Sequence, residues 1–268
     1  MFIAPCACLR HLGRRGLLTG AAVLISLRAH AQSPAADPVL IDDLVTANHI
    51  LYDQGVVDGF GHISARHDKD PNRYLLARSM APALVTAADI MEFDLDSTAV
   101  DARGRTPYLE RFIHGEIYKA RPEVKSIVHS HSPAVLPFAD TKILLRPMNH
   151  IAGFLGSGPP VYEIRGAAGL GSDMLIRNAA LGQSLAAKMG THQILLMRGH
   201  GSVAAAQSIK HVVFRAIYTE VNARVEIQAL SIGKPEFLNV KEAAAAMTTN
   251  DTLVERPWSL WKQRVTAK

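Results

Sequence analysis

The feature that most constrains this chain is the stretch Ser126–Pro133, which reads Ser-Ile-Val-His-Ser-His-Ser-Pro. Its apolar and β-branched residues, bounded on both sides by proline, predict a short buried strand over Val124–His131. Because side chains alternate between the two faces of a strand, His129 and His131 point the same way. Two imidazoles at this spacing form half of a divalent-metal site, and burying both without a ligand would be costly.

Two further segments supply side chains of the right kind. A second buried strand is predicted over Gln193–Arg198, and a Gly-His-Gly turn centred on His200 follows it directly. The two glycines allow a tight turn and a close approach, which suits a ligand at the end of a strand. Upstream, a helix predicted over Leu109–Tyr118 places Glu110 in its first turn. Taken alone, Glu110 is more simply interpreted as a first-turn charge.

The remaining periodicity predicts a central, mostly antiparallel sheet with helices on its faces, which is an α/β fold class. Further strands are predicted at residues 61–66, 74–78 and 90–95, with a hairpin between the first two. Helices are predicted at residues 40–56, 173–189 and 209–233. In the last of these, the residues expected to face inward are Val213, Ala216, Ile217, Val221, Val225 and Leu230.

The first 31 residues carry the pattern of an export signal. Arg14-Arg15 precedes an apolar run at residues 16–27, and an Ala-x-Ala cleavage motif ends at Ala31. The arginine pair favours the twin-arginine route to the periplasm. A retained membrane anchor is the alternative, but the apolar run is too short to span a bilayer. We therefore predict a cleaved signal peptide at residues 1–31 and a single domain at residues 32–268.

The signal segment also changes the interpretation of the charge. Four arginines and no acidic residue lie in it, so its removal lowers the formal charge of the chain from +5 to +1. No basic patch then argues for nucleic acid as a partner. Both cysteines, Cys6 and Cys8, lie in the same segment, so the exported chain has no disulfide.

The motifs together resemble the class II aldolase/adducin family. They are the segment Glu110–His131 with Arg121-Pro122-Glu123 ahead of its strand, and the later Arg198-Gly199-His200-Gly201. The similarity extends over roughly Leu40–Leu230 and implies a single three-layer α/β/α sandwich. It also implies a homotetramer with active sites near subunit interfaces, a small-molecule substrate and no stable membrane insertion.

The resemblance also implies roles for four residues. His129, His131 and His200 correspond to the family's metal ligands, with one divalent ion per subunit that is Zn²⁺ or, alternatively, Mn²⁺, Fe²⁺ or Mg²⁺. Glu110 lies nineteen residues before His129, the interval at which the family's sugar-phosphate aldolases place their proton-transferring glutamate. Glu110 is therefore the implied catalytic acid/base.

The chain departs from those aldolases where they hold the substrate phosphate. Their Gly-Asn turn, Thr-Gly turn and Ser-Ser pair correspond here to Gly61-His62, Ser79-Met80 and Tyr108-Leu109. The loss of small donors makes phosphate recognition doubtful. Several arginines are expected near the pocket, where a guanidinium would suit a carboxylate: Arg78, Arg111, Arg146 and Arg198. The predicted substrate-binding residues are Ser79, Arg78, Tyr108, His150 and Tyr218.

These features imply a metal-dependent carbon–carbon lyase, either a decarboxylase or an aldolase. Its substrate would be an unphosphorylated hydroxy- or oxo-acid, which reacts through a metal-stabilised enolate. A dehydratase or an epimerase on the same metal site is an alternative, because those reactions also pass through such an enolate. A non-catalytic, adducin-like binding module is the other alternative, and loss of the histidines would indicate it.

Overall fold

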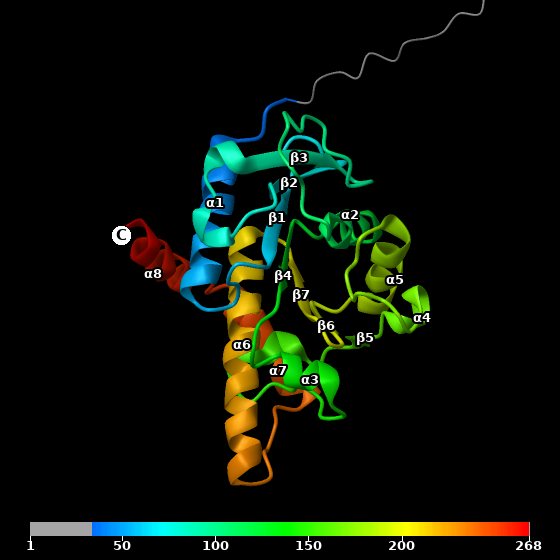
Figure 1. Ribbon diagram of the computed structural model, residues 1–268. Helices are drawn as coiled ribbons and strands as arrows, with labels where there is room; N and C mark the ends of the chain where they lie inside the picture. Colours follow the sequence, from blue (N-terminus) through cyan, green and yellow to red (C-terminus); the bar gives the residue numbers. More distant parts are fainter. Residues whose placement is uncertain (1–33, 268) are drawn as a thin grey trace, which may run out of the picture. The chain divides into compact units, whose positions relative to one another are not determined.

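Seven strands form one sheet in the computed structural model, which describes residues 34–267 (Figure 1). Their order across the sheet is β3-β2-β1-β4-β7-β6-β5, and only the β5–β6 pair is parallel. The predicted, mostly antiparallel sheet is therefore confirmed. The strands are β1 (His62–Arg66), β2 (Arg73–Ala77), β3 (Ile90–Asp94), β4 (Ser126–Ser130), β5 (Val161–Tyr162), β6 (Ile194–Met197) and β7 (Gly201–Ala206).

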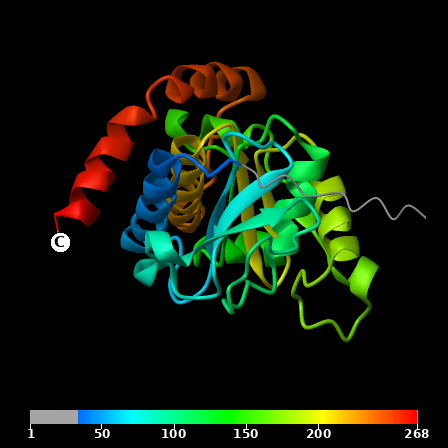
Figure 2. The same cartoon turned by 90° about the horizontal axis from the view of Figure 1, so that it is seen from above.

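Helices cover both faces of this sheet, and Figure 2 shows the layers from above. Residues along a strand alternate between two cores, so Val128 packs into one and its neighbour Ile127 into the other. This arrangement confirms the predicted three-layer α/β/α fold. One face is covered by α1 (Pro38–Asp53) and α6 (Ile209–Ile232), with α8 (Glu255–Thr266) against them, and the other by α2 (Arg111–Ala120) and α5 (Ala179–Met189).

Shorter helices connect the main elements. The α-helices among them are α3 (Leu136–Asp140), α4 (Arg165–Ala168) and α7 (Val240–Asp251). The single-turn or irregular 3-10 helices are η1 (Pro82–Leu84), η2 (Ala87–Asp89) and η3 (His150–Leu155). α7 packs against η3 and begins at a capping box, in which Asn239 and Glu242 bond to each other's backbone N–H groups.

Helix caps decide two boundaries that the sequence pattern misplaced. The helix predicted from residue 173 begins at residue 179, because the Asn178 side chain accepts a hydrogen bond of 3.0 Å from the Leu181 N–H. Residues 173–178 are instead an extended connection next to the site described below. The helix predicted from Leu109 begins at Arg111, and Glu110 occupies the N-cap position ahead of the first turn. Strand β7 was not predicted at all.

The prediction for the long helix α6 was half wrong. Its first half is buried as expected, including Val213, Ala216 and Ile217. The second half extends beyond the sheet (Figure 1), so Val221, Val225 and Leu230 are 37%, 36% and 39% exposed. Besides Ala223, the buried residues there are polar: Asn222 and Glu226 hold the backbone of residues 146–148.

The structure bears on the prediction about membrane insertion but not on those about the signal peptide and localisation. Within residues 34–267, no helix is long and apolar enough to cross a bilayer. The predicted signal peptide at residues 1–31 lies outside the described residues, so its twin-arginine type, its cleavage and the periplasmic localisation stay predictions. All described residues belong to one compact unit. The proposed boundary at residue 32 also stays a prediction.

Candidate metal centre

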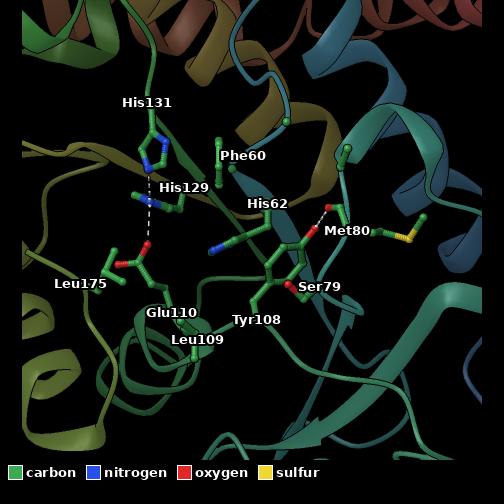
Figure 3. Close-up of a pocket in the computed structure, with 13 residues that line it drawn as sticks. Phe60, His62, Ser79, Met80, Tyr108, Leu109, Glu110, His129, His131 and Leu175 are labelled. Carbon is green, nitrogen blue, oxygen red and sulfur yellow. Dashed lines mark hydrogen bonds and ion pairs between the residues drawn. The ribbon is translucent and has the colours of Figure 1, made fainter. Parts of the chain in front are cut away.

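Three histidines and one glutamate converge at the end of β4, and Figure 3 shows three of the four, His129, His131 and Glu110. One ligand atom from each lies within 4.8 Å of the others. The Nε2 atoms of His129 and His131 are 3.2 Å apart, and Oε2 of Glu110 is 3.5 Å from His129 Nε2 and 3.3 Å from His200 Nε2. Strand β4 ends at Ser130, so His131 follows the strand directly and still meets His129, as the predicted strand parity required.

Hydrogen bonds to backbone carbonyls orient two of the imidazoles. His129 Nδ1 lies 3.1 Å from the Ser202 carbonyl oxygen, and His200 Nδ1 lies 2.9 Å from that of Met174. A carbonyl only accepts hydrogen bonds, so each Nδ1 carries the hydrogen and each Nε2 presents its lone pair to the cluster. His200 Nε2 is buried without a hydrogen-bond partner. This donor set therefore fits a divalent ion, whose binding would satisfy that atom.

The Glu110 carboxylate is fixed at the entrance to α2 and is not part of its first turn, contrary to the prediction. Its Oε1 accepts a 2.9 Å hydrogen bond from the Ile176 N–H, and Oε2 faces the imidazoles. Burial raises the pKa of Glu110, but when the rings of His129 and His200 are protonated, their hydrogen bonds and charge outweigh burial and hold that pKa well below its usual range. The carboxylate is then ionised at neutral pH.

The glycines around His200 have the two uses that the sequence indicated. Gly199 has a φ of +62°, a left-handed conformation that makes the turn between β6 and β7. Gly201 allows close approach instead. A Cβ atom there would lie 2.2 Å from the Ser130 carbonyl oxygen and 3.1 Å from Cδ2 of His131.

Replacing Gly201 by alanine is expected to disturb both the sheet and the centre. The added methyl group must push β4 away from β7 and displace His131, at a cost of about 1–3 kcal/mol in the free energy of unfolding. Metal affinity should fall as well. Thermal unfolding and metal titration measure the two effects. Gly166→Ala is the matched control, because a Cβ there meets nothing within 4 Å; equal behaviour of the two variants would contradict the expectation.

A cavity of about 280 Å³ opens beside the cluster of three histidines and Glu110. Its lining is largely apolar and aromatic, and no lysine or arginine of the described chain contributes to it. Figure 3 shows His62, Tyr108 and Glu110 around the same space as His129 and His131. The full set of lining residues is Gly59, Phe60, Gly61, His62, Ser79, Met80, Ala81, Tyr108, Leu109, Glu110, His129, His131 and Leu175.

Two of the five predicted substrate-binding residues line this cavity. They are Ser79 and Tyr108; the Tyr108 ring packs on His62 with centroids 4.6 Å apart, and its hydroxyl donates to the Met80 carbonyl. Arg78 does not line the cavity, because its guanidinium is paired with Asp89 at 2.6 Å. Its predicted position is therefore corrected.

His150 and Tyr218 also lie away from the cavity of their own chain. The carbonyl of His150, at the start of η3, accepts a 2.9 Å hydrogen bond from Asn250. The Tyr218 ring packs between Phe214 and Trp261, at centroid distances of 4.7 and 6.1 Å. Packing against α7 and α8 thus keeps both side chains from the positions predicted for them within one chain. Entry into a neighbouring subunit's site stays a prediction.

The other arginines expected near the substrate have partners elsewhere. Arg111 donates to the carbonyls of two loop residues at 2.8 and 2.9 Å. Arg146 lies 3.6 Å from the centroid of the Phe237 ring, and Arg198 pairs with Glu163. None of them lines the cavity. The expectation of an arginine clamp for a carboxylate is therefore wrong for the single chain.

Sequence reasoning missed several groups that shape the centre. Ser202, Met174 and Ile176 act through backbone atoms, and side-chain identity gives no indication of such a role. The sequence singled out His62 only as the counterpart of a phosphate-binding turn, yet its ring belongs to a buried series of hydrogen bonds. The sequence did place His62 next to a glycine at the start of a predicted strand. In the structure, the register between β1 and β4 then pairs His62 with His129.

Together these features define a class of protein: an α/β/α fold with a three-histidine, one-glutamate centre at a small-molecule pocket. The sequence profile of the class II aldolase and adducin N-terminal domain matches residues 42–227. The chain therefore belongs to the class II aldolase/adducin family.

Named relatives give further comparisons. The chain is 34% identical over 255 residues to the decarboxylase tropJ of Talaromyces stipitatus, which covers 87% of this chain and 95% of that protein. It is 32% identical over 213 residues to the 3,4-dihydroxyphthalate decarboxylase of Terrabacter sp. (74% and 83% covered). An L-fuculose 1-phosphate aldolase from Glaciozyma antarctica PI12 superposes with a TM-score of 0.70 at 21% identity (87% and 93% covered), which supports the fold.

Proposed function

We propose that this chain is a divalent-metal-dependent decarboxylase of an unphosphorylated hydroxy acid, with the carboxylate on an aromatic ring beside a hydroxyl group. The family and two relatives named as decarboxylases support an enzyme of the lyase type. The observation that carries the proposal is the pocket itself. It joins a three-histidine, one-glutamate cluster to an apolar, aromatic cavity whose lining contains no cationic side chain.

The shape and polarity of the lining favour a flat ring over a sugar phosphate. Phe60, Met80, Leu109 and Leu175 offer apolar surface, which suits the faces of an aromatic ring. A phosphate dianion needs several donors, and burying it without them is strongly disfavoured. Tyr108 stands where the sugar-phosphate aldolases keep a serine, and its hydroxyl already donates to a carbonyl of the protein.

The side chains divide the work of such a reaction. His129, His131 and His200 would hold the ion, for which we propose Zn²⁺ because three neutral imidazoles suit it. The bound ion supplies a Lewis acid for the substrate oxygen next to the reacting carbon. Glu110 would take the proton of the substrate hydroxyl and deliver it to the ring carbon that bears the carboxylate, where electrons of the phenolate form the new C–H bond. The electron pair of the C–C bond then returns to the ring as CO₂ leaves, and the product phenolate takes a proton from water.

Decarboxylation of ortho-hydroxylated aromatic acids is the expected activity. The purified, Zn²⁺-loaded protein should release CO₂ from 2,3-dihydroxybenzoate or 3,4-dihydroxyphthalate, and removal of the metal by a chelator should abolish the release. Benzoate, which lacks the hydroxyl group, is the matched control and should be inert. L-fuculose 1-phosphate should be cleaved at least about a hundredfold less efficiently, because its phosphate finds no donors. Efficient cleavage that depends on the phosphate would show the proposal to be wrong.

We also propose that the active molecule is a homo-oligomer, a tetramer by family resemblance. The apolar residues left exposed on the second half of α6 support an interface there: Val221, Val225, Leu230 and Ile232. Light scattering on the purified protein measures the mass of the assembly directly. A monomer at all concentrations would contradict this part of the proposal.

A further inference from the structure

A chain of hydrogen bonds runs from the cavity into the core between β1 and α2. His62 Nδ1 lies 2.7 Å from His114 Nε2, and His114 Nδ1 lies 2.6 Å from Ser64 Oγ. Ser64 Oγ lies in turn 2.8 Å from the Tyr118 hydroxyl. All four side chains are buried, and only His62 lines the cavity.

The direction of the donors along this chain follows from its inner end. Ser64 is the only recorded hydrogen-bond partner of the Tyr118 hydroxyl among the described residues. If Ser64 donated to Tyr118, the phenolic hydrogen would be buried without an acceptor, which costs more than a bond is worth. Tyr118 therefore donates to Ser64. The Ser64 hydroxyl then donates to Nδ1 of His114.

The two histidines pass this direction on to the cavity. Burial lowers the pKa of His114 to about 3, so the ring is neutral and has one donor and one acceptor. Its Nδ1 accepts from Ser64, so its Nε2 carries the hydrogen and donates to Nδ1 of His62. The remaining hydrogen of a neutral His62 then lies on Nε2. No protein partner is recorded for that atom, and the ring lies among the cavity's lining side chains (Figure 3).

We propose that His62 presents its Nε2–H to the cavity, where it donates a hydrogen bond to an anionic oxygen of the substrate. Tyr118, Ser64 and His114 are positioning residues that fix this tautomer. The identity of the oxygen rests on the proposed function, whereas the tautomer does not. A neutral donor suits a decarboxylase. It orients a carboxylate without the strong ion pair that would stabilise the charge lost when CO₂ departs.

Nitrogen NMR tests the tautomer without reference to activity. The full protein is labelled with ¹⁵N-histidine and loaded with Zn²⁺, which is diamagnetic, and the His62 signals are assigned by their loss in His62→Gln. The hydrogen is expected on Nε2 of His62. In Tyr118→Phe the fixed donor at the inner end is gone, so a mixture of the two tautomers should appear. Hydrogen on Nδ1 in the unmodified protein, or no change in Tyr118→Phe, would overturn the proposal.

Tyr74→Phe is the matched control for that measurement. Tyr74 is equally buried and packs on Tyr118 at a centroid distance of 5.5 Å, but its hydroxyl donates to Ser97 and to the Arg111 carbonyl. Tyr74→Phe removes a phenolic oxygen from the same buried group of aromatic rings, but it leaves the hydrogen bonds among His62, His114, Ser64 and Tyr118 intact. His62 should keep its tautomer in Tyr74→Phe. A mixture of tautomers in this variant as well would mean that the effect of Tyr118→Phe comes from weaker packing of the core and would contradict the proposal.

Ligand binding tests the role of the donor. The affinity of the Zn²⁺-loaded protein for 2,3-dihydroxybenzoate is measured by calorimetry with Glu110→Gln present throughout, so that turnover is slow. It should fall about tenfold to a hundredfold when His62→Leu is added, the usual effect of losing a bond to a charged group. His62→Gln should restore part of it through its amide N–H, with metal content unchanged in both. Equal affinity in all three proteins would overturn the donor role. Binding that depends on His62, together with no CO₂ release by the protein with Glu110 intact, would instead refute only the proposed reaction.

Discussion

Replacing His129 and His131 together by alanine is expected to remove the metal and reduce turnover to background. The Nε2 atoms of these residues lie 3.2 Å apart at the end of β4, so the double variant deletes half of the four-residue cluster. Loss of even an outer partner of a metal ligand costs tenfold to a hundredfold in affinity. Loss of two ligands should therefore lower the metal affinity by more than about a hundredfold. Metal analysis of the purified variant, together with CO₂ release, measures both effects.

His192→Ala is the control for this experiment. Its side chain is exposed, and only its backbone atoms take part in recorded hydrogen bonds. The control should keep about one divalent ion per chain and full activity. Full metal occupancy in the double variant would refute the assignment of His129 and His131 as ligands.

Changing Glu110 to glutamine should lower turnover by about two to four orders of magnitude, the usual contribution of a positioned acid/base. An amide cannot take up and return a proton at neutral pH. Its oxygen can still accept the hydrogen bond from Ile176 that holds the side chain in place. The fold and metal content should therefore survive, which separates a proton-transfer role from a structural one.

Metal content, thermal stability and turnover are measured side by side for Glu110→Gln and for Glu123→Gln, whose carboxylate is largely exposed and pairs only with Arg121. The second variant should behave like the unmodified protein. Unchanged turnover in Glu110→Gln would show that Glu110 is not the acid/base, and loss of the metal would make Glu110 a ligand instead.

Local pattern was sufficient to single out the two histidines at the end of β4 that meet in the four-residue cluster. A strand has a period of two, so His129 and His131 share a face wherever that strand lies. The glycines around His200 likewise mark a turn and a close approach by their own conformational properties. The alternation of apolar residues also predicted the layers of the fold. These inferences need only residues that are close together in the sequence, so the sequence alone is sufficient for them.

The groups that orient the centre depend on contacts between distant segments. Glu110 is oriented by a backbone N–H that lies 66 positions further along the chain. The tautomers of His129 and His200 depend on carbonyl groups of Ser202 and Met174, and any residue type provides a carbonyl. The sequence pattern for a helix through residues 173–178 was overruled by a cap at Asn178, which leaves that segment's backbone available to the site.

The sequence by itself thus determined the fold class and the shared face of His129 and His131, because both follow from local periodicity, whereas the expected roles of His200 and Glu110 came from the resemblance to the family. Only the tertiary structure showed which charged side chains line the cavity. Arg78 and Arg198 find carboxylates closer than the cavity, and a guanidinium that already has a partner gains little by turning away from it. The structure places His62 at the cavity instead, because strand register sets it beside His129 and α2 brings His114 to its other nitrogen.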